Sequence, residues 1–562
     1  MMQYLVAGGG KIKLTDADFV AEGGEGKIYA HGQFIYKIYT DISKVIPAAK
    51  IQELSVLNHP NIIRPQALLL DTNRTAVGFS MQRVQNTVAL PRLFTNDFRS
   101  QHRLTDRTII ELLEKMRLTT VFIHQHGCLI VDGNEMNYLV DEMTFENPYF
   151  IDVDSYQTPS FPATALMLSI RDYHSQHFSM LTDWFAFAIV ACQLLIGIHP
   201  YKGKHPDFKK HDLAARMQAN VSIFNKKVSL PSAVRDFSVI PQAFHDWLMR
   251  LLEKGERLPP PTLLGGKIAA VPVQIQVVQG TDYFIISLVR EFPNLIRSHF
   301  TFNTTHIVLT DQQAYIDTQT VTSIEPGAHI IFEAKTHTPL AVSIRNNLLK
   351  VIDLSTNQPA AVTLKADRLL RVGNALYVVY ADQLIQVKIL HYAGKLLISA
   401  GTSWNIMPNA HQVLSGLIYQ NVLGKPYLVI PYQNACMIRP IPELAGYKIV
   451  SGQHDKGVAM LIGHKHGQYD QLIIRFNENY TAHSVRILDN QEVLDNNFVT
   501  LDNGVVIHIP HDGELVIFHR HGDAVKNIQD PQIRTTMRLS HEGNTVLFYT
   551  DNKLYRIKVK MP

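Results

Sequence analysis

The pattern of apolar and polar positions divides the chain into two unlike parts. In the first part, residues 19–39 alternate like two strands around a glycine cluster, and apolar residues recur at helical spacing over 44–57 and 106–125. Beyond about residue 266 the helical spacing nearly disappears, and short alternating runs recur between turns rich in Asn, Asp and Gly. The sequence therefore predicts an α+β region followed by an all-β region.

The longest apolar run covers residues 184–198 and is interrupted by Gln193. A membrane-spanning helix needs about 20 apolar residues, so this run predicts a buried helix instead. Residues 1–13 have no apolar stretch of signal-peptide length. The 3 cysteines lie far apart, which favours reduced thiols over disulfides or a cysteine zinc site. We expect a soluble, cytoplasmic protein with no membrane partner.

Length and charge narrow the class of protein further. At 562 residues the chain is too long for one core, so at least two domains are expected. The composition, 46% hydrophobic and 18% charged, is that of an ordinary globular protein. A net charge of +4 without dense Lys/Arg runs argues against a nucleic-acid-binding protein.

Polar residues suited to phosphoryl transfer gather between residues 129 and 154. Asp132 lies five residues before Asn137, and Asp152 lies fifteen residues after Asn137. One carboxylate at this spacing can take the proton of an attacking hydroxyl, while an amide and a second carboxylate hold Mg²⁺ against nucleotide phosphates. An Asx-rich turn between two strands gives the same pattern.

A glycine cluster and a lysine precede this stretch. Gly23, Gly24 and Gly26 stand between two strand-like runs, and Lys37 lies on the second run. Glycines allow backbone N–H groups to approach phosphate oxygens, and a lysine on the next strand supplies a charge for the α and β phosphates. The alternative is a plain hairpin with a glycine turn.

With these motifs in this order, residues 1–258 resemble a protein kinase domain, with an N-lobe over about 1–85 and a C-lobe over about 86–258. They are most similar to a bacterial Ser/Thr-kinase-like group. The resemblance rests on Gly23-Gly24-Glu25-Gly26, Asp152-Val153-Asp154-Ser155-Tyr156-Gln157 and Gly197-Ile198-His199-Pro200-Tyr201-Lys202-Gly203. Further motifs are Asp183-Trp184-Phe185-Ala186-Phe187, similar to the start of the buried kinase helix, and Arg257-Leu258-Pro259, similar to the closing Arg-Pro.

The resemblance implies a role for each matching residue. Lys37 would bind the α and β phosphates of ATP with Glu53 as its partner, and Asp132 would be the catalytic base. Asn137 and Asp152 would hold Mg²⁺ or Mn²⁺. The other implied residues are Gly23, Gly24, Gly26 and Met81 for nucleotide binding, and Asp183 and Arg257 for structure.

Several positions depart from the kinase pattern. Ile130 and Val131 stand where His-Arg usually precede the catalytic Asp, which implies an atypical, non-RD kinase without a partner for an activation-loop phosphate. Asn134 replaces the usual Lys. Asp154 replaces the Gly of Asp-Phe-Gly, so Asp154 is a metal ligand candidate beside Asp152. The usual Pro-Glu is missing, and Asp172 is either the substitute partner of Arg257 or a plain surface aspartate.

The second part begins after a Pro/Gly linker over residues 259–268. Short strand-like runs recur from 273–278 to 553–558, which favours a β-propeller of six or seven blades at about 42 residues each over 269–562. The terminal strand would pair with an early one to close the ring. The alternatives are two β-sandwich domains or a β-helix. Close histidine pairs, such as His519 and His521, lack companion ligands at fixed spacing, so no histidine metal site is predicted.

The sequence as a whole predicts an ATP- and Mg²⁺-dependent Ser/Thr protein kinase that transfers the γ-phosphate to a protein hydroxyl. Its propeller would bind a protein substrate or regulator. One alternative is a pseudokinase scaffold that binds nucleotide without phosphotransfer. Another is a kinase of a small-molecule acceptor, because fold alone does not fix the substrate.

Overall fold

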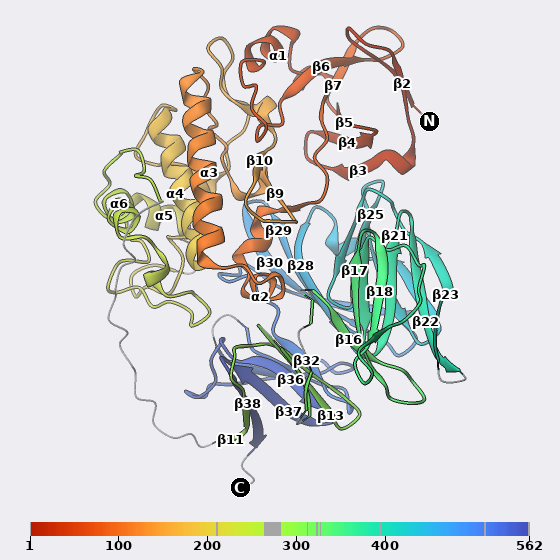
Figure 1. Cartoon of the computed structure of the whole chain (residues 1–562). Coiled ribbons are helices and arrows are strands. Elements are labelled where there is room, and N and C mark those ends of the chain that lie inside the picture. Colours follow the sequence, from red (N-terminus) through yellow and green to blue (C-terminus); the bar gives the residue numbers. More distant parts are fainter. Residues whose placement is uncertain are drawn as a thin grey trace.

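The structure is a computed structural model that describes residues 2–209, 212–263, 283–311, 313–317, 319–321, 324–325, 327–392, 395–510 and 513–559. The predicted order of an α+β region and an all-β region is confirmed. In Figure 1 the N-terminal strands (red) lie above β17 to β25, and α2 and α3 (orange) lie beside β28 to β30. The predicted strand 273–278 and the linker from residue 264 onward fall outside the described residues.

The chain opens with an antiparallel sheet of seven strands, in the order β2-β1-β6-β7-β5-β4-β3. The strands are β1 Met2–Val6, β2 Lys11–Leu14, β3 Phe19–Glu22, β4 Gly26–His31, β5 Phe34–Tyr39, β6 Pro65–Leu70 and β7 Ala76–Gln82. A Cβ on Gly78 of β7 would overlap the carbonyl oxygen of Lys37 on β5, so only glycine allows these strands to pair so closely.

The helix predicted over 44–57 is shorter in the structure. Helix α1 spans Ala48–Leu54 and begins directly after Pro47, whose extended backbone stands at the helix start. A proline disfavours helical backbone in the residue before it, so Ile46 cannot belong to the helix. The helix predicted over 106–125 is confirmed as α3, Asp106–Gln125, with Thr105 as its N-cap.

The rest of the α+β region is mostly helical. Its further helices are α2 Asn96–His102, α4 Met180–Ile196, α5 Leu213–Gln218 and α6 Gln242–Leu252. A three-stranded sheet, in the order β10-β9-β8, stands beside them: β8 Thr87–Ala89, β9 Tyr138–Asp141 and β10 Pro148–Phe150. Helix α4 is buried from Asp183 to Ile196, as the apolar run predicts. No helix among the described residues is long and apolar enough to cross a membrane.

The all-β region contains seven four-stranded antiparallel sheets within its described residues. The first four sheets are β12 Ile296–Phe302, β13 Thr305–Thr310, β14 Ala314–Ile316 and β15 Gln319–Val321; β16 His329–Phe332, β17 Pro339–Arg345, β18 Leu348–Asp353 and β19 Gln358–Pro359; β20 Arg368–Val372, β21 Ala375–Tyr380, β22 Gln383–Tyr392 and β23 Lys395–Asn405; and β24 His411–Leu414, β25 Leu417–Val422, β26 Lys425–Tyr432 and β27 Ala435–Pro440.

The last three sheets complete this series. They are β28 Lys448–Asp455, β29 Val458–Lys465, β30 Gln468–Phe476 and β31 His483–Leu488; β32 Phe498–Thr500, β33 Val505–His508, β34 Leu515–His519 and β35 Val525–Ile528; and β36 Arg538–Glu542, β37 Thr545–Thr550 and β38 Lys553–Val559 with β11 Phe284–Glu291. Among the described residues, the first strand of the region therefore pairs with the last, Phe284 opposite Val559. Tight turns set the register, as where Asn346 and Asn347, both at positive φ, join β17 to β18.

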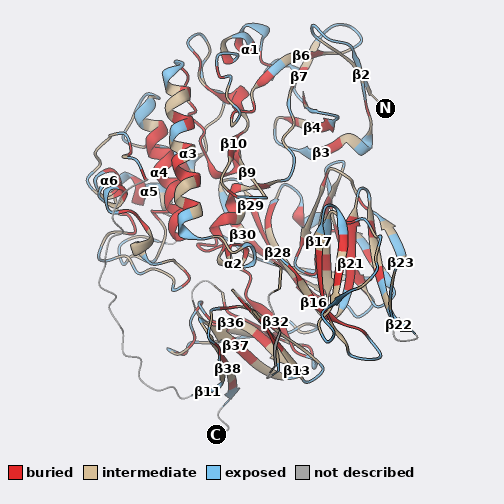
Figure 2. Ribbon diagram, in the orientation of Figure 1, coloured by how far each residue is buried: buried red, intermediate tan, exposed pale blue. Residues whose placement is uncertain are grey.

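The two regions share a core. One hydrophobic cluster combines α3, α4 and α6 with Val450 and Ile462 of β28 and β29, Tyr469 of β30, and Leu494. Figure 2 shows the buried residues continuing from α4 into β29 and β30. The hydroxyl of Tyr469 donates to the buried carboxylate of Glu135 over 2.8 Å. The sheets and the helical part thus contribute side chains to one continuous hydrophobic core, and this shared core holds the two regions together.

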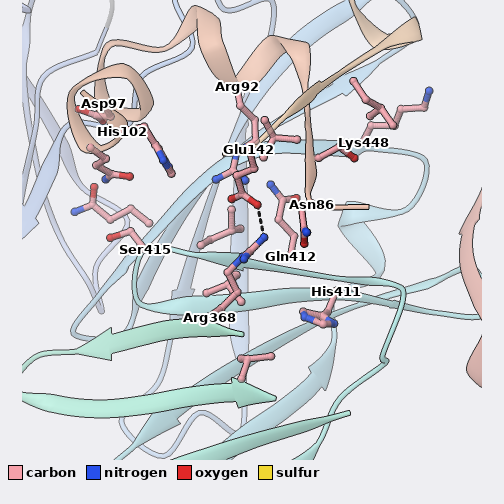
Figure 3. Close-up of a pocket in the computed structure, with 18 of the residues that line it drawn as sticks. Asn86, Arg92, Asp97, His102, Glu142, Arg368, His411, Gln412, Ser415 and Lys448 are labelled. Atoms are coloured by element: carbon pink, nitrogen blue, oxygen red, sulfur yellow. Dashed lines mark hydrogen bonds and ion pairs between the residues drawn. The ribbon is translucent and has the colours of Figure 1, made fainter. Parts of the chain in front are cut away.

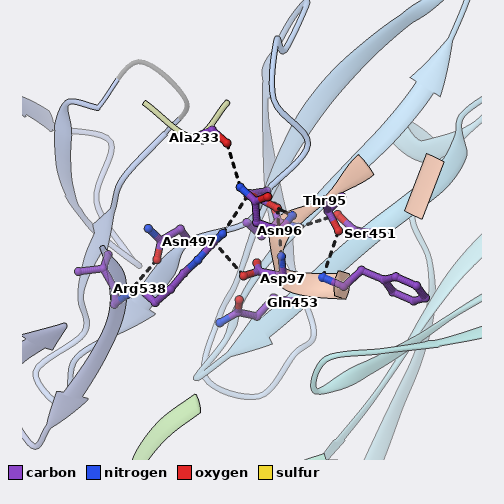
Figure 4. A network of polar contacts seen from close by, with 12 residues as sticks. Thr95, Asn96, Asp97, Ala233, Ser451, Gln453, Asn497 and Arg538 are labelled. Atoms are coloured by element: carbon purple, nitrogen blue, oxygen red, sulfur yellow. Dashed lines mark hydrogen bonds and ion pairs between the residues drawn. The ribbon is translucent and has the colours of Figure 1, made fainter. Parts of the chain in front are cut away.

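A polar network supports the same junction. Arg538 of β36 forms ion pairs with Asp97 of α2 at 2.9 Å and with Asp495 at 3.0 Å. Asp495 also accepts a hydrogen bond from the backbone N–H of Asn96 over 2.9 Å. Figure 4 shows Asp97 and Arg538 meeting where the start of α2 approaches the sheets. The guanidinium therefore joins two carboxylates from different regions of the chain.

Candidate functional site

The loop before β9 is fixed to helix α4 by one buried carboxylate. Asp183, in the first turn of α4, accepts hydrogen bonds from the backbone N–H groups of Ile130 and Val131 at 2.8 and 2.9 Å, and its Oδ2 lies 2.8 Å from Nε2 of His124. Val131 has a φ of 62°. Positive φ is rare for a β-branched residue and costs free energy, which the Asp183 contacts offset. This strained turn positions the next residue, Asp132.

Asp132 is the predicted catalytic base. Its backbone carbonyl accepts a hydrogen bond from Nδ2 of Asn137 over 2.9 Å, and its Oδ1 accepts the backbone N–H of Met167 over 2.7 Å. Burial raises the pKa of the Asp132 carboxyl, and the Met167 hydrogen bond partly opposes that rise. A buried carboxylate with a raised pKa is suited to accept a proton from a hydroxyl.

Three carboxylates surround the ammonium of Lys37 on β5. Nζ of Lys37 lies 2.6 Å from Asp154, 3.1 Å from Asp152 and 3.1 Å from Glu25. Burial alone lowers the pKa of Lys37, but the charges of Asp154 and Asp152 outweigh it and raise the pKa above its usual value. Tyr39 also donates to Asp154 over 2.7 Å. Lys37 is therefore a cation held in place by several carboxylates. The sequence predicted Lys37, Asp152 and Asp154 as site residues, but it did not predict that they touch one another.

The same three carboxylates suit a divalent cation. Oxygens of Glu25, Asp152 and Asp154 lie within 4.8 Å of one another. Hard oxygen ligands of this type are those that Mg²⁺ and Mn²⁺ prefer. Asp152 and Asp154 belong to the predicted metal set, and Glu25 joins them from the glycine loop. Asn137, the third predicted ligand, donates its amide to Asp132.

The glycine loop turns tightly between β3 and β4. The backbone N–H of Gly23 donates to the carbonyl of Gly26 over 2.9 Å, and a Cβ on Gly26 would overlap the carbonyl oxygen of Ile38. Around Gly23 and Gly24 the space is open. These glycines and Met81, at the end of β7, line the same cavity as Lys37. The residues predicted to bind nucleotide therefore share one space.

The structure does not bring Glu53 to Lys37. Glu53 on α1 instead accepts a hydrogen bond from the backbone N–H of Ser160 over 3.2 Å. The α1 residue that is buried toward Asp154 is Lys50, whose Nζ has no hydrogen-bond partner among the described residues. Burial lowers the pKa of Lys50, and Asp154 opposes that shift. The sequence signal for Lys50 was a lysine on the apolar face of a short helix.

The segment after the metal motif crosses the site and is anchored at both ends. Its start pairs Gln157 with Leu129 through two backbone hydrogen bonds of 3.0 Å. Farther on, Asp172 and Arg257 form the bidentate ion pair that the sequence offered as one alternative, with distances of 2.6 and 2.7 Å. Between these anchors the Met167 N–H reaches Asp132. The segment therefore occupies one oxygen of the carboxylate that is the predicted base.

A single large cavity contains these groups. Its volume is about 2130 Å³, and Lys37, Met81, Asp132, Asn137 and Asp152 line it. Part of the remaining wall comes from one edge strand of each of the seven four-stranded sheets among the described residues: β12, β16, β20, β24, β28, β32 and β36. Ligand pockets for small molecules are usually about 300–1,000 Å³. The cavity therefore has room for more than one ligand.

No protein-family model matches the sequence, and no curated protein matches it. Among solved structures, the chain is similar to the kinase PK-1 of Cydia pomonella granulovirus, with 13% identity, a TM-score of 0.34, and coverage of 44% of this chain and 90% of that one. It is also similar to a twitchin kinase fragment from C. elegans, described as an autoregulated protein kinase with immunoglobulin domains. There the identity is 13%, the TM-score 0.35, and the coverage 47% of this chain and 58% of that one.

Proposed function

We propose that the chain is an ATP-dependent phosphotransferase of the Ser/Thr protein kinase type, lacking the Arg of His-Arg-Asp, with Mg²⁺ or Mn²⁺ as its metal. The observation that carries this proposal is the strained turn at Val131, held by Asp183, which presents Asp132 to the cavity that Lys37, Asp152 and Asp154 also line. A base, a phosphate-binding cation and hard metal ligands in one space are the parts that phosphoryl transfer requires.

The residues divide the work in the proposed reaction. Oδ2 of Asp132 takes the proton of the acceptor hydroxyl while the hydroxyl oxygen attacks the γ-phosphorus. The bond between the γ-phosphorus and the β–γ bridging oxygen breaks, and ADP leaves with that oxygen. Lys37 leaves its carboxylate partners to bind the α and β phosphates, and Gly23 and Gly24 let backbone N–H groups approach them. Asp152, Asp154 and Glu25 would hold the metal, which neutralises the phosphate charge when bound, and Asn137 keeps Asp132 in place.

We also propose that the seven sheets form a closed, seven-bladed β-propeller. Two observations support it: β11 pairs with β38, which joins the ends of the region, and one edge strand from every sheet lines the same cavity. Sheets arranged radially around a channel place their inner edges in this way. The propeller would select the protein substrate or regulator, because its inner strands share the cavity with the catalytic groups.

The same shared cavity favours a second candidate function, phosphorylation of a small molecule. The catalytic carboxylate is reached from a space that is bordered by the sheets and crossed by the segment carrying Met167. A small acceptor could enter this space without docking a folded surface beside Asp132. Both functions use the same base, metal ligands and nucleotide.

The test is transfer of label from γ-labelled ATP by the full-length protein, with Mg²⁺ or Mn²⁺, beside the Asp132→Asn variant. Label on added protein that disappears in the variant supports the protein kinase. Consumption of ATP only with small hydroxylated acceptors supports the second candidate. Neither product, despite a nucleotide-dependent rise in melting temperature, overturns both and leaves a nucleotide-binding scaffold.

A further inference from the structure

Away from the catalytic groups, the cavity holds two arginines and a histidine at the junction of the two regions. The arginine cluster consists of Arg92, which follows β8, His102 at the end of α2, and Arg368 at the start of β20. Figure 3 shows Arg92 and His102 turned into the same space as Arg368, with Glu142 between Arg92 and Arg368. The helical part and the sheets therefore both contribute to this wall.

The charges in the arginine cluster are not balanced. Glu142 is the carboxylate at this point, and it accepts a hydrogen bond from Nη2 of Arg368. Among the described residues Arg92 has no ion pair within 4 Å, and its buried Nε has no hydrogen-bond partner. A buried donor without an acceptor costs free energy. Glu142 thus pairs with Arg368, and among the described residues the guanidinium of Arg92 has no carboxylate within ion-pair distance.

Aromatic side chains hold the guanidinium of Arg92 in position. Its guanidinium lies over the ring of Phe98, 4.6 Å from the centroid. His102 packs on Phe98 at 4.2 Å and on Phe145 at 5.2 Å between ring centroids. Burial, together with the charge of Arg368, lowers the pKa of Arg92 to about 10, and burial lowers the pKa of His102 to about 4. His102 is therefore neutral at pH 7 and can donate one N–H.

We propose that the arginine cluster is a binding site for a small polyanion, a phosphorylated or polycarboxylated molecule held by Arg92 and Arg368 between the two regions. Guanidinium groups pair with phosphate and carboxylate oxygens through two parallel hydrogen bonds, and an anion here supplies the acceptor that Arg92 lacks. The labelled polar residues Gln412 and Lys448 line the same pocket and border the ligand.

This site is separate from the nucleotide and metal groups. Glu142 follows Asn137 by five residues, and strand β9 occupies the interval. At about 3.3 Å per residue, the backbone of Glu142, which pairs with Arg368, lies roughly 16 Å along the chain from that of Asn137. The proposal therefore does not depend on phosphoryl transfer, and it stands or falls by binding alone. A ligand here contacts both regions at once and strengthens their junction.

The test is calorimetric titration of the full-length protein, freed of metal ions on a chelating resin, with pyrophosphate and, separately, with citrate. The protein carries Lys37→Met with Asp154→Asn, which removes the nucleotide-site cation and its buried partner together. We expect binding at one site for at least one probe. Arg92→Met and Arg368→Met should each weaken it about 10-fold or more. The control Arg107→Met removes an exposed arginine on α3 and should change nothing.

Binding of pyrophosphate alone identifies a phosphate site, binding of citrate alone identifies a carboxylate site, and binding of both supports a general polyanion site. Binding of neither probe overturns the proposal, as does binding that both Arg92→Met and Arg368→Met leave unchanged. If Arg92→Met fails to fold by circular dichroism, Arg368→Met decides, because the side chain of Arg368 is 45% exposed and its loss leaves the core intact. If the double background fails to fold, the same titrations use the wild-type background.

Discussion

At the scale of single residues, the site consists of buried charged side chains that contact one another closely. Ionising the Asp132 carboxyl costs free energy, because burial raises its pKa. For a group whose pKa is raised in the folded state, the contribution to stability is present at low pH and is lost as pH rises through that pKa. The ionised form of Asp132 therefore lowers stability, and the raised pKa makes this carboxylate a stronger base.

Asp132→Asn separates these two effects. The amide cannot accept the hydroxyl proton, so we expect phosphoryl transfer to fall by about 100-fold to 10,000-fold. The melting temperature at pH 7 should stay the same or rise, because the buried charge is gone and the Asn oxygen still accepts the Met167 N–H. Label transfer and thermal unfolding measure the two. A large fall in melting temperature would show that the carboxylate is structural.

Lys37→Met tests the buried charge group. Asp154 is 4% exposed and would lose the cation 2.6 Å away, so we expect the free energy of unfolding to fall by about 3–5 kcal/mol. Burial raises the pKa of Asp154, so the variant should regain stability as pH falls and the carboxyl takes up a proton. Urea unfolding at several pH values measures this.

The matched control is Lys37→Met combined with Asp154→Asn, which removes both charges. Replacing a buried ion pair as a unit is usually close to neutral, so most of the lost stability should return. If the double variant is no more stable than Lys37→Met, the Lys37–Asp154 contact does not account for the loss.

The sequence could predict residues whose roles follow from local spacing. Asp132, Asn137 and Asp152 lie within a short stretch, so their joint position needs few assumptions about the fold. Lys50 could not be predicted as the buried α1 residue, because Lys50 and Glu53 are one helical turn apart and only the rotation of α1 decides between them. Glu25 contacts Lys37 because of the conformation of the glycine loop, and the helix and strand propensities of its residues do not determine that conformation.

At the scale of elements, the segment between Gln157 and helix α4 is anchored at both ends and contacts Asp132 between the anchors. Backbone pairing with Leu129 fixes one end, and the Asp172–Arg257 ion pair fixes the other. Both partners of that ion pair are shielded, with the Asp172 side chain 1% exposed. The kinase resemblance could suggest this pair, because the usual Pro-Glu is missing and Asp172 stands eleven residues before Asp183 as a substitute partner for Arg257. It could not place Met167 over Asp132, because no periodic pattern describes an irregular segment.

Met167→Pro removes the N–H that reaches Asp132 and puts the ring Cδ in its place, so the Asp132 carboxylate has to turn away from that position. Met167 has a φ of −80°, which proline adopts. The lost hydrogen bond was lowering the pKa of Asp132, so that pKa should rise further. In an active enzyme, the acidic limb of the pH–rate profile should move to higher pH.

Met167→Ala is the control for this change, since it keeps the N–H and removes the side chain that lies near Gly467. Its acidic limb should match the wild type. An equal shift in both variants would assign the effect to the side chain, and no shift in Met167→Pro would show that the hydrogen bond does not influence the base.

At the scale of the whole molecule, the two regions meet through buried charges as well as apolar side chains. Burial and the nearby Asp495 raise the pKa of Asp97 to about 7, against the opposing charge of Arg538. Stability from this group is therefore present near pH 4 and is lost as pH rises to about 7. Asp97→Asn removes the titration.

Across that pH range we expect wild-type stability to fall relative to Asp97→Asn by about 1 kcal/mol, allowing for solvent screening of a partly exposed carboxylate. The comparison uses the pH slopes of urea unfolding, because Asp97→Asn also weakens the Arg538 ion pair at every pH. Parallel slopes in the two proteins would contradict the raised pKa.

Alternating strands and turns rich in Asn, Asp and Gly could indicate an all-β region. The sequence predicted six or seven propeller blades, and the described residues form seven four-stranded sheets. The shared cavity and the shared core could not be predicted. They depend on contacts between segments hundreds of residues apart, such as Tyr469 with Glu135 and Arg538 with Asp97. Such pairs have no common spacing in the sequence, and each partner alone reads as an ordinary surface or strand residue.

The shared core also predicts how the molecule unfolds. Because Val450, Ile462 and Tyr469 pack in the same cluster as α3 and α4, the helical part and the sheets should lose structure in one transition. Trp184 and Trp247 lie in helices, so a Trp404→Phe background makes fluorescence report on the helical part alone. Far-UV circular dichroism reports on both regions, and the two curves should coincide.

Tyr469→Phe then tests the contact that links the regions. It leaves the carboxylate of Glu135, 3% exposed, without its 2.8 Å donor, and retains only the longer 3.5 Å contact with Gln193. A loss of about 1–3 kcal/mol follows. Both probes should shift together to lower temperature, whereas Tyr392→Phe, at an exposed tyrosine on β22, should shift neither. Two separated transitions in Tyr469→Phe or in the parent would mean that the regions unfold independently, and the junction would then be a docking contact instead of a common core.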